Sequence, residues 1–269
     1  MPELPEVETT VRGIAPHLVQ QRFDSISVHK TSLRWPIPSD FVDVLTGATC
    51  LSVSRRAKYI LIETSVRNVL AHLGMSGSFR LVTPNTPLKT HDHLQIGLAE
   101  LELRYHDPRR FGCVLWADSD RAKALLACLG PEPLTPQFDG AWLYRLSRTK
   151  RIAVKNFIMS NPVVVGVGNI YAAESLYLAG IRPTRPANRI SLPRYQKLAE
   201  AIQQVLARSI ESGGTTLRDF VNGHGEPGYF QQTLQVYGRN GQPCLRCQTP
   251  IQSQVIGGRN SFYCPACQR

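Results

Sequence analysis

Four cysteines near the carboxyl end constrain the fold of this chain more than any other feature. Cys244 and Cys247 form one C-x-x-C pair, Cys264 and Cys267 form a second, and sixteen residues separate the pairs. Four thiolates at this spacing are typical of a tetrahedral zinc site, and the double match disfavours the alternative of unpaired thiols. Because protein would fill all four positions, we expect one structural zinc ion in a finger over residues 235–269. Metal binding would supply folding free energy to a hairpin with few apolar residues.

The chain carries an excess of positive charge. Its 31 lysines and arginines outnumber its 20 acidic residues, which gives a net charge of +11 and a pI of about 9.6. Such an excess predicts a polyanionic partner, and nucleic acid leads because no basic amphipathic helix indicates a membrane surface. From Gln235 onward there are four arginines and no acid. Arg259 lies between the cysteine pairs, where a hairpin tip would fall, so we expect it to reach DNA.

The remaining composition indicates an intracellular protein. No apolar run approaches the roughly 18 residues that span a bilayer, and the acidic start is unlike a secretory signal. We therefore expect a cytoplasmic protein with no membrane partner. Cys50, Cys113 and Cys128 lie in apolar contexts and are predicted to be buried side chains rather than disulfide partners.

The amino end begins Met1-Pro2-Glu3 and continues as an amphipathic helix. Apolar residues recur at three- and four-residue steps, and the helix should end between Gly13 and Arg22; the stripe is Leu4, Val7, Val11, Ile14 and Leu18. Removal of Met1 would leave Pro2 with a secondary amine, whose neutral form can attack an electrophilic carbon and form an imine. Glu3 stands beside this amine and could shuttle protons. The alternative is that Pro2 only starts the helix and the acids only cap it.

Residues 23–116 have the sequence pattern of a β domain. Eight short β-branched and aliphatic runs alternate with turn signals, and no helical pattern intervenes, which predicts an antiparallel sandwich or barrel. The runs are Ser25–Lys30, Leu51–Ser54, Tyr59–Glu63, Asn68–Leu73, Ser78–Val82, His93–Leu98, Leu101–Tyr105 and Cys113–Trp116.

Three turns in this region carry side chains of interest. They are residues 55–58, with Lys58 at a basic tip, residues 72–77, with Met75 between glycines, and residues 107–112, with Arg109 beside Phe111. Met75, Arg109 and Phe111 are of the types that enter between base steps in the minor groove. The alternative for each is a solvated turn whose apolar side chain folds back into the core.

A proline-rich segment marks the clearest boundary. Three prolines stand within residues 130–136, so we expect a domain over 1–130, a stiff linker over 131–136 and a helical domain over 137–230. The expected helices are Leu143–Leu146, Ile152–Met159, Ile170–Leu178 and Leu192–Ile210. A glycine turn over 166–169 precedes the third, where free amides could bind a phosphate, although a plain connection is equally consistent. The loop 215–230 lacks periodicity and is predicted to be functional or mobile.

Together these motifs resemble the bacterial formamidopyrimidine-DNA glycosylase family. The resemblance rests on the start Pro2-Glu3-Leu4-Pro5-Glu6-Val7-Glu8-Thr9, on residues 72–77, 107–112 and 166–172, and on the four-cysteine finger, all in family order. It implies an α+β fold: an N-terminal antiparallel β-sandwich with an N-terminal helix, a helix–two-turn–helix domain with a lesion-capping loop over 215–230, and a zinc finger. It also implies excision of oxidised purines such as 8-oxoguanine and formamidopyrimidines from duplex DNA, followed by β,δ-elimination at the abasic site.

The resemblance assigns roles residue by residue. Pro2 resembles the nucleophile, Glu3 the proton donor and acceptor, and Glu6 an acid that positions this end. Lys58 resembles a lysine near the damaged nucleotide. The phosphate-binding residues it implies are His72, Asn169, Tyr237 and Arg259. Lys155 matches a DNA-binding lysine of the family more loosely. Met75, Arg109 and Phe111 resemble the residues that fill the gap left by the extruded base.

Two competing functions remain open at this point. An endonuclease VIII-like glycosylase for oxidised pyrimidines shares the proline, Glu3 and the finger, but Leu4 and wedge candidates on two loops favour the purine enzyme. A non-catalytic binder of damaged DNA would need neither the proline nor Glu3.

Two positions depart from the family pattern, Pro162 after Asn161 and Asn260 after Arg259. We expect the protein to act as a monomer.

Overall fold

The computed structural model describes residues 2–214 and 234–269. Within these ranges the chain forms two compact units, one that includes residues up to 127 and one that includes residues 128–211 and 234–269. The predicted lesion-capping loop 215–230 lies outside the described residues. None of the helices in the described ranges combines the length and apolar character needed to cross a membrane.

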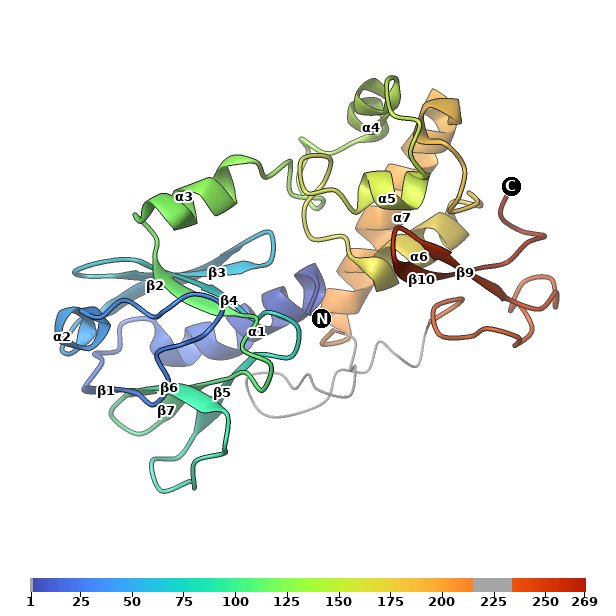
Figure 1. The fold of residues 1–269 in the computed structure, drawn as a ribbon. Coiled ribbons are helices and arrows are strands. Elements are labelled where there is room, and N and C mark those ends of the chain that lie inside the picture. The colour runs from blue at the N-terminus through green and yellow to red at the C-terminus, as the bar shows by residue number, and fades with distance from the viewer. Residues whose placement is uncertain (1, 215–233) are drawn as a thin grey trace. The chain divides into compact units, whose positions relative to one another are not determined.

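The first unit is a sandwich of two four-stranded antiparallel sheets (Figure 1), which confirms the predicted fold class. One sheet has the order β1-β6-β7-β5, with β1 (Ser25–Val28), β6 (Asp92–Gly97), β7 (Glu102–His106) and β5 (Ser78–Val82). The other has the order β2-β3-β4-β8, with β2 (Cys50–Arg56), β3 (Tyr59–Thr64), β4 (Val69–His72) and β8 (Cys113–Trp116). Each predicted run coincides with one of these strands, because alternating apolar residues face the shared core.

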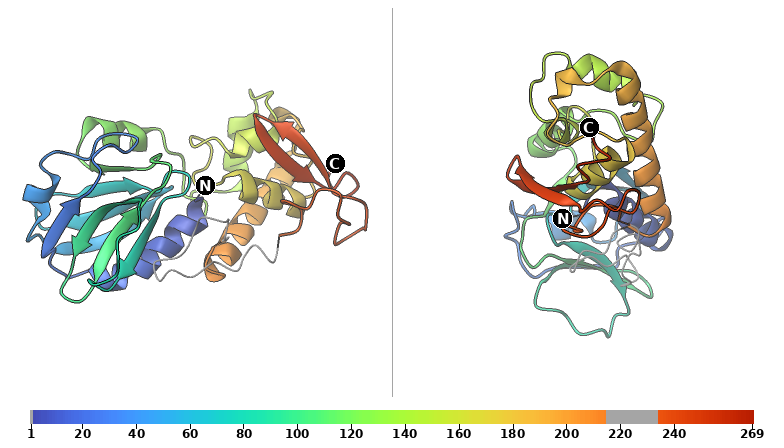
Figure 2. Two further views of the ribbon diagram at one scale, coloured as in Figure 1. Left: turned by 60° about the horizontal axis from the view of Figure 1, so that its bottom comes forward. Right: turned by 90° about the vertical axis from the view of Figure 1, so that its right-hand side faces the viewer.

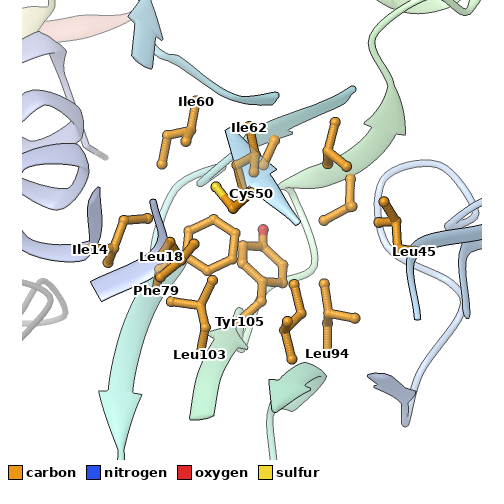
Figure 3. Close-up of a cluster of buried hydrophobic side chains, with 14 of the residues drawn as sticks. Ile14, Leu18, Leu45, Cys50, Ile60, Ile62, Phe79, Leu94, Leu103 and Tyr105 are labelled. Carbon is orange, nitrogen blue, oxygen red and sulfur yellow. The ribbon is translucent and has the colours of Figure 1, made fainter. Parts of the chain in front are cut away.

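Helix α1 (Leu4–Leu18) packs against β2 and β5, which are edge strands of the two sheets. Its predicted apolar stripe is at most 7% exposed, and Val7, Val11, Ile14 and Leu18 join the core of the sandwich. Figure 3 shows Ile14 and Leu18 among side chains from both sheets. Burial of each such side chain is worth about 1.5–3 kcal/mol. The amino end is thereby held against the sandwich.

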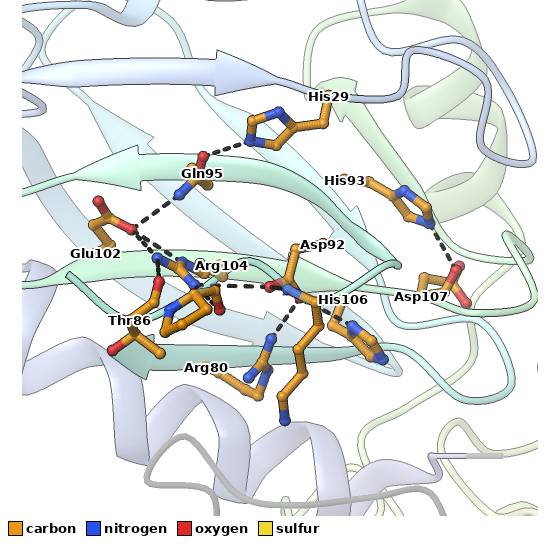
Figure 4. Close-up of polar contacts among 12 residues, drawn as sticks. His29, Arg80, Thr86, Asp92, His93, Gln95, Glu102, Arg104, His106 and Asp107 are labelled. Atoms are coloured by element: carbon orange, nitrogen blue, oxygen red, sulfur yellow. Dashed lines mark hydrogen bonds and ion pairs between the residues drawn. The ribbon is translucent and has the colours of Figure 1, made fainter. Parts of the chain in front are cut away.

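A network of buried charges lies on the β5-β6-β7 sheet (Figure 4). The Asp92 carboxylate accepts hydrogen bonds from Arg80 Nη2 at 2.5 Å and from the Lys89 N–H at 3.0 Å, and contacts His106 Nδ1 at 2.9 Å. Burial alone raises the pKa of Asp92, but these partners outweigh it and hold the pKa below its ordinary value. Arg104 is also buried and donates to Glu102. The network joins β5, β6 and β7, and β7 leads directly into the 107–112 turn.

The second unit combines helices with a small hairpin. The helices are α4 (Gly140–Ser147), α5 (Val154–Ile158), α6 (Asn169–Leu178), the 3-10 turn η1 (Ala187–Arg189) and α7 (Leu192–Glu211). The hairpin of β9 (Gln252–Ile256) and β10 (Arg259–Tyr263) packs against α6 (Figure 2). Ala173 and Tyr177 of α6 share a core with Cys244, Ile251 and Cys264. The cysteine-rich segment and the helices are therefore one compact unit.

Two short helices and the exposure of one cysteine were not predicted from the sequence. Helices α2 (Phe41–Leu45) and α3 (Asp120–Ala127) were not expected: α2 is little more than one turn, and Ala122 is the one buried residue of α3. The prediction that Cys128 is buried is wrong. This thiol is exposed because it follows the weakly buried α3, whereas Cys50 and Cys113 are buried as expected.

Candidate active site and nucleic-acid interface

The start of α1 holds the residues expected to carry chemistry. Glu3 is the N-cap residue, and it forms a capping box with Glu6 in which each side chain binds the other's backbone N–H. The Glu3 N–H donates to Glu6 Oε2 at 2.8 Å. Pro2 is buried, and Glu3 and Glu6 are 2% and 3% exposed. The capping box fixes the backbone that immediately follows Pro2, and the positioning role of Glu6 in the chemistry stays a prediction.

Lys58 lies on a tight turn between β2 and β3. Arg56 pairs with Tyr59, so Ala57 and Lys58 form a two-residue turn in which Ala57 has a φ of +54°. At the end of β4, His72 is paired with Tyr59. These two strand ends bring the lysine and the histidine together, although they are far apart in the sequence.

His72 is held in its neutral form. Burial, then the charges of Lys58 and Arg34, lower its pKa to about 4. Its Nδ1 accepts a hydrogen bond from the Gly74 N–H at 3.0 Å. The neutral ring must therefore carry its proton on Nε2, which leaves an N–H donor suited to a phosphate oxygen.

The 72–77 and 107–112 turns pack against each other through backbone. A Cβ at Gly74 would lie 2.4 Å from the Gly112 nitrogen, and a Cβ at Gly112 would lie 1.8 Å from the Tyr105 hydroxyl. The Tyr105 hydroxyl donates to the His72 carbonyl at 3.1 Å, and the Gly112 N–H donates to Asp107 Oδ2 at 2.8 Å. The sequence placed Asp107 in the predicted 107–112 turn and Tyr105 in the preceding strand, but it assigned neither of them a role in holding the two turns together.

The three wedge candidates project from these turns. Met75 is 38% exposed and Phe111 is 46% exposed, which excludes the alternative in which they fold back into the core. The Arg109 guanidinium lies 4.9 Å from the centre of the Phe111 ring. Exposed apolar side chains beside a guanidinium suit insertion into a stack of bases. Their contact with DNA stays a prediction.

In the second unit, Lys155 joins α6 to the hairpin. This lysine is fully buried, and its ammonium donates to Asn169 Oδ1 and, at 2.5 Å, to Ser261 Oγ. The Asn169 amide donates to the Asn260 carbonyl at 3.0 Å. The contact at residue 260 is made by backbone, so the departure from the family pattern there does not disturb it. The structure places Lys155 behind Asn169 rather than at the surface, and a direct DNA contact by Lys155 stays a prediction.

Two further predicted residues lie on the cysteine-rich segment. Arg259 begins β10 at the exposed tip of the hairpin. Tyr237 stacks edge-on against Phe262, with ring centres 5.1 Å apart, and its N–H donates to Glu174 at 2.9 Å. The Glu174 carboxylate also accepts the N–H groups of residues 235 and 236. Sequence reasoning missed Glu174, because nothing local marks an acid on α6 as an anchor for a segment 60 residues later.

The four cysteines converge as the spacing predicted. Their sulfurs lie within 4.8 Å of one another, with distances of 3.9 Å for Cys244–Cys267, 3.5 Å for Cys247–Cys264 and 3.4 Å for Cys247–Cys267. Tetrahedral zinc at 2.3 Å from each sulfur requires about 3.8 Å between sulfurs, so the donor set fits. Tyr177 also lies 3.2 Å from the Cys244 sulfur, a supporting contact outside the ligands. The cysteines form the site of one structural zinc ion.

Comparison with known proteins matches the whole chain. Residues 1–114 match the formamidopyrimidine-DNA glycosylase N-terminal domain, residues 129–221 match the H2TH domain of the same glycosylase, and residues 241–269 match the zinc finger found in FPG and IleRS. The formamidopyrimidine-DNA glycosylases of Marinobacter nauticus and Pseudomonas entomophila are 55% and 57% identical over the full length of both chains.

Solved structures agree. The Lactococcus lactis Fpg in complex with DNA containing an abasic site has a TM-score of 0.91, with 34% identity over 99% of both chains. The same enzyme with N7-benzyl-Fapy-dG DNA has a TM-score of 0.91, with 34% identity over 100% of both. The sandwich, the helix–two-turn–helix unit and the zinc finger define a class of DNA glycosylases. Within this class, the chain belongs to the formamidopyrimidine-DNA glycosylase family.

Proposed function

We propose that this chain excises oxidised purines, 8-oxoguanine and formamidopyrimidines, from duplex DNA and then cleaves the strand at the abasic site. Relatives of 55% and 57% identity are named for the formamidopyrimidine activity, and a structural relative binds abasic-site DNA. The observation that supports the chemistry best is the buried capping box directly behind Pro2. A terminus without a function would not need an ordered, buried capping box. A nucleophile does need one, because its nitrogen must approach the reacting carbon in a fixed geometry.

The proposed chemistry begins once Met1 is removed, because only then does Pro2 carry a free secondary amine. Its nitrogen lone pair attacks the anomeric carbon of the flipped nucleotide, and the base departs with the bonding electrons and a proton from the Glu3 carboxyl group. The sugar ring opens, its oxygen takes the proton that the Pro2 nitrogen loses, and an iminium joined to Pro2 remains. The Glu3 carboxylate accepts the C2′ proton, and the 3′ phosphate leaves with the electrons of its bond to carbon. Loss of the C4′ proton to solvent then expels the 5′ phosphate in the same way, and water hydrolyses the iminium and restores the amine.

The remaining predicted residues would hold the DNA. Lys58, His72, Asn169, Tyr237 and Arg259 supply N–H or O–H donors for backbone phosphates. Extrusion of a base costs a few kcal/mol, and insertion of the wedge candidates Met75, Arg109 and Phe111 would replace the lost stacking. We infer that the protein works on cellular DNA in the cytoplasm as a monomer.

Borohydride reduction tests the central step. Incubation of the processed protein with duplex DNA containing 8-oxoguanine and borohydride should give a crosslink that mass spectrometry maps to residue 2. The variants Lys58→Ala and Lys155→Ala should still give this crosslink, since neither supplies the nitrogen. A crosslink at either lysine, or none at all in the wild type, would refute the proposed chemistry. Release of thymine glycol from a matched duplex measures how far oxidised pyrimidines are also accepted.

A further inference from the structure

We propose that Arg55 is a positioning residue that fixes Lys58 relative to the helix that carries Pro2 and Glu3. This inference deepens the proposed function and rests on it. Sequence reasoning noted Arg55 only as part of a basic turn, and none of the proposed DNA contacts involves it. The grounds are its contacts with two separate elements of the first unit.

One guanidinium bridges helix α1 and the β2–β3 turn. Arg55 Nε donates to Glu8 Oε2 at 2.9 Å, and Arg55 Nη1 donates to the Ala57 carbonyl at 2.8 Å. The Arg55 side chain is 11% exposed and that of Glu8 is 21% exposed. Glu8 lies about one turn of α1 beyond Glu3 and uses its other oxygen to bind Arg12 at 2.8 Å. The lysine turn is thereby tied to the helix with the proposed nucleophile.

The β2–β3 turn has a backbone conformation that requires stabilisation by a neighbouring side chain. Ala57 has a φ of +54°, in the left-handed region that residues with a Cβ rarely adopt, and its side chain is 2% exposed. Its carbonyl belongs to the peptide group that leads directly into Lys58. The hydrogen bond from Arg55 therefore fixes the peptide plane from which the Lys58 side chain departs, in a backbone conformation that alanine alone does not favour.

The Glu8 carboxylate of this contact is ionised at the pH where the enzyme would work. Burial by itself raises the pKa of Glu8, but Arg55 and Arg12 outweigh this effect and lower it below its ordinary value. An ionised carboxylate gives a shorter and stronger bond to a guanidinium than a neutral acid does. The bridge is therefore intact throughout the neutral range.

The geometry gives a sharp substitution test. A guanidinium presents several donors in a fixed fork, so it can hold Glu8 and Ala57 together, whereas a lysine keeps the charge but has one nitrogen. Arg55→Lys should therefore remove the tie to the turn while leaving the positive charge that nonspecific DNA attraction requires. Arg12→Ala is the matched control, since it removes the exposed partner of Glu8 and leaves the Glu8–Arg55 contact.

We expect Arg55→Lys to slow single-turnover release of 8-oxoguanine by about tenfold or more, because small misplacements of catalytic groups have large effects on rate. The Kd for duplex DNA with an abasic-site analogue should change by less than about twofold, since the charge is kept. Arg12→Ala should match the wild type in both measurements. In a Lys58→Ala background, Arg55→Lys should add less than about a twofold further loss, as a double-mutant cycle requires when one residue acts through the other.

Three outcomes would overturn the proposal: an unchanged rate in Arg55→Lys, an equal loss with and without Lys58, or a loss of DNA affinity that accounts for the whole effect. If Arg55→Lys does not fold, Glu8→Gln serves instead, with the same direction of change and the same dependence on Lys58. A borohydride crosslink at residue 2 in both wild type and variant shows that the proposed chemistry stands while the positioning role is judged. Absence of the crosslink in the wild type would instead refute the chemistry.

Discussion

Single side chains in this protein act mainly by orienting other groups. Glu6 binds the backbone of Glu3, and the buried ammonium of Lys155 holds Asn169. His72 is fixed as a neutral donor by the Gly74 N–H and by its surroundings. The residues expected to touch DNA therefore depend on partners that do not, and substitutions at these residues should have effects that charge alone does not explain.

Lys155→Met should destabilise the protein by about 1–3 kcal/mol, because Asn169 Oδ1 and Ser261 Oγ would lose a buried donor. Affinity for abasic-site DNA should fall as well, since Asn169 and the hairpin lose their common support. Urea unfolding and fluorescence anisotropy measure the two effects. The exposed Lys150→Met is the control and should be neutral. Full stability in Lys155→Met would show that the ammonium is not a structural donor.

The lowered pKa of His72, about 4, predicts that its contribution to DNA affinity does not change between pH 5.5 and pH 7.5. The ring is neutral in the folded protein above about pH 5. His72→Ala should therefore weaken binding to abasic-site DNA by the same factor at pH 5.5 and at pH 7.5. A charged imidazolium would instead make the loss larger at pH 5.5, so affinities measured at the two pH values at constant salt distinguish the two cases.

At the scale of elements, the two sheets hold in place the 72–77 and 107–112 turns, which carry the wedge candidates. Gly74 and Gly112 let the 72–77 and 107–112 turns approach through backbone, and the Asp92 network secures β7, the strand that leads into the second of these turns. Helix α1 packs against the edge strands β2 and β5, so the amino end and the turns belong to one packed body. A substitution in the Asp92 network should therefore lower the free energy of unfolding of the whole first unit.

Asp92→Asn should cost about 3–5 kcal/mol at pH 7, because Arg80 would remain buried without its carboxylate, whereas Arg104 keeps its contact with Glu102. The folded pKa of Asp92 lies below its ordinary value of 3.8, so the carboxylate stabilises the fold above that pH. The gap between wild type and variant should be full at pH 5–7 and shrink as the pH falls below about 3.8 toward the lower folded pKa. Unfolding midpoints across this range check the sign, with the exposed Asp24→Asn as the control. A gap that widened in acid would contradict the assignment.

For the whole molecule, the metal and the net charge matter most. The zinc segment shares a core with α6, and few apolar residues hold its hairpin otherwise. The net charge of +11 should make DNA binding weaken steeply with salt, beyond what any single contact explains.

Removal of zinc by a chelator should raise amide hydrogen exchange over residues 234–269 and lower DNA affinity, while strands of the sandwich keep their protection. Structural zinc supplies folding free energy only to the segment that it closes, although its shared core should also loosen part of α6. Exchange followed by mass spectrometry gives the comparison, and readdition of zinc should restore the protected state. Uniform loss of protection in both units would show that the metal stabilises more than the finger.

The sequence by itself determined the features that repeat over short distances. The apolar stripe of α1, the eight strands and the two cysteine pairs were all predicted, because helix and strand periods and metal-ligand spacing are local properties. Helix α3 and the exposure of Cys128 were not, because the buried face of α3 is a single alanine and gives almost no pattern.

Only the tertiary structure decided which distant residues meet. The burial of Lys155 behind Asn169, the anchoring of residues 235–237 by Glu174 and the bridge from Glu8 through Arg55 to the lysine turn all join segments with no common local signal. Such contacts depend on how the elements pack against one another, which no single segment specifies. Local periodicity fixes what each segment becomes, whereas packing fixes what each side chain touches.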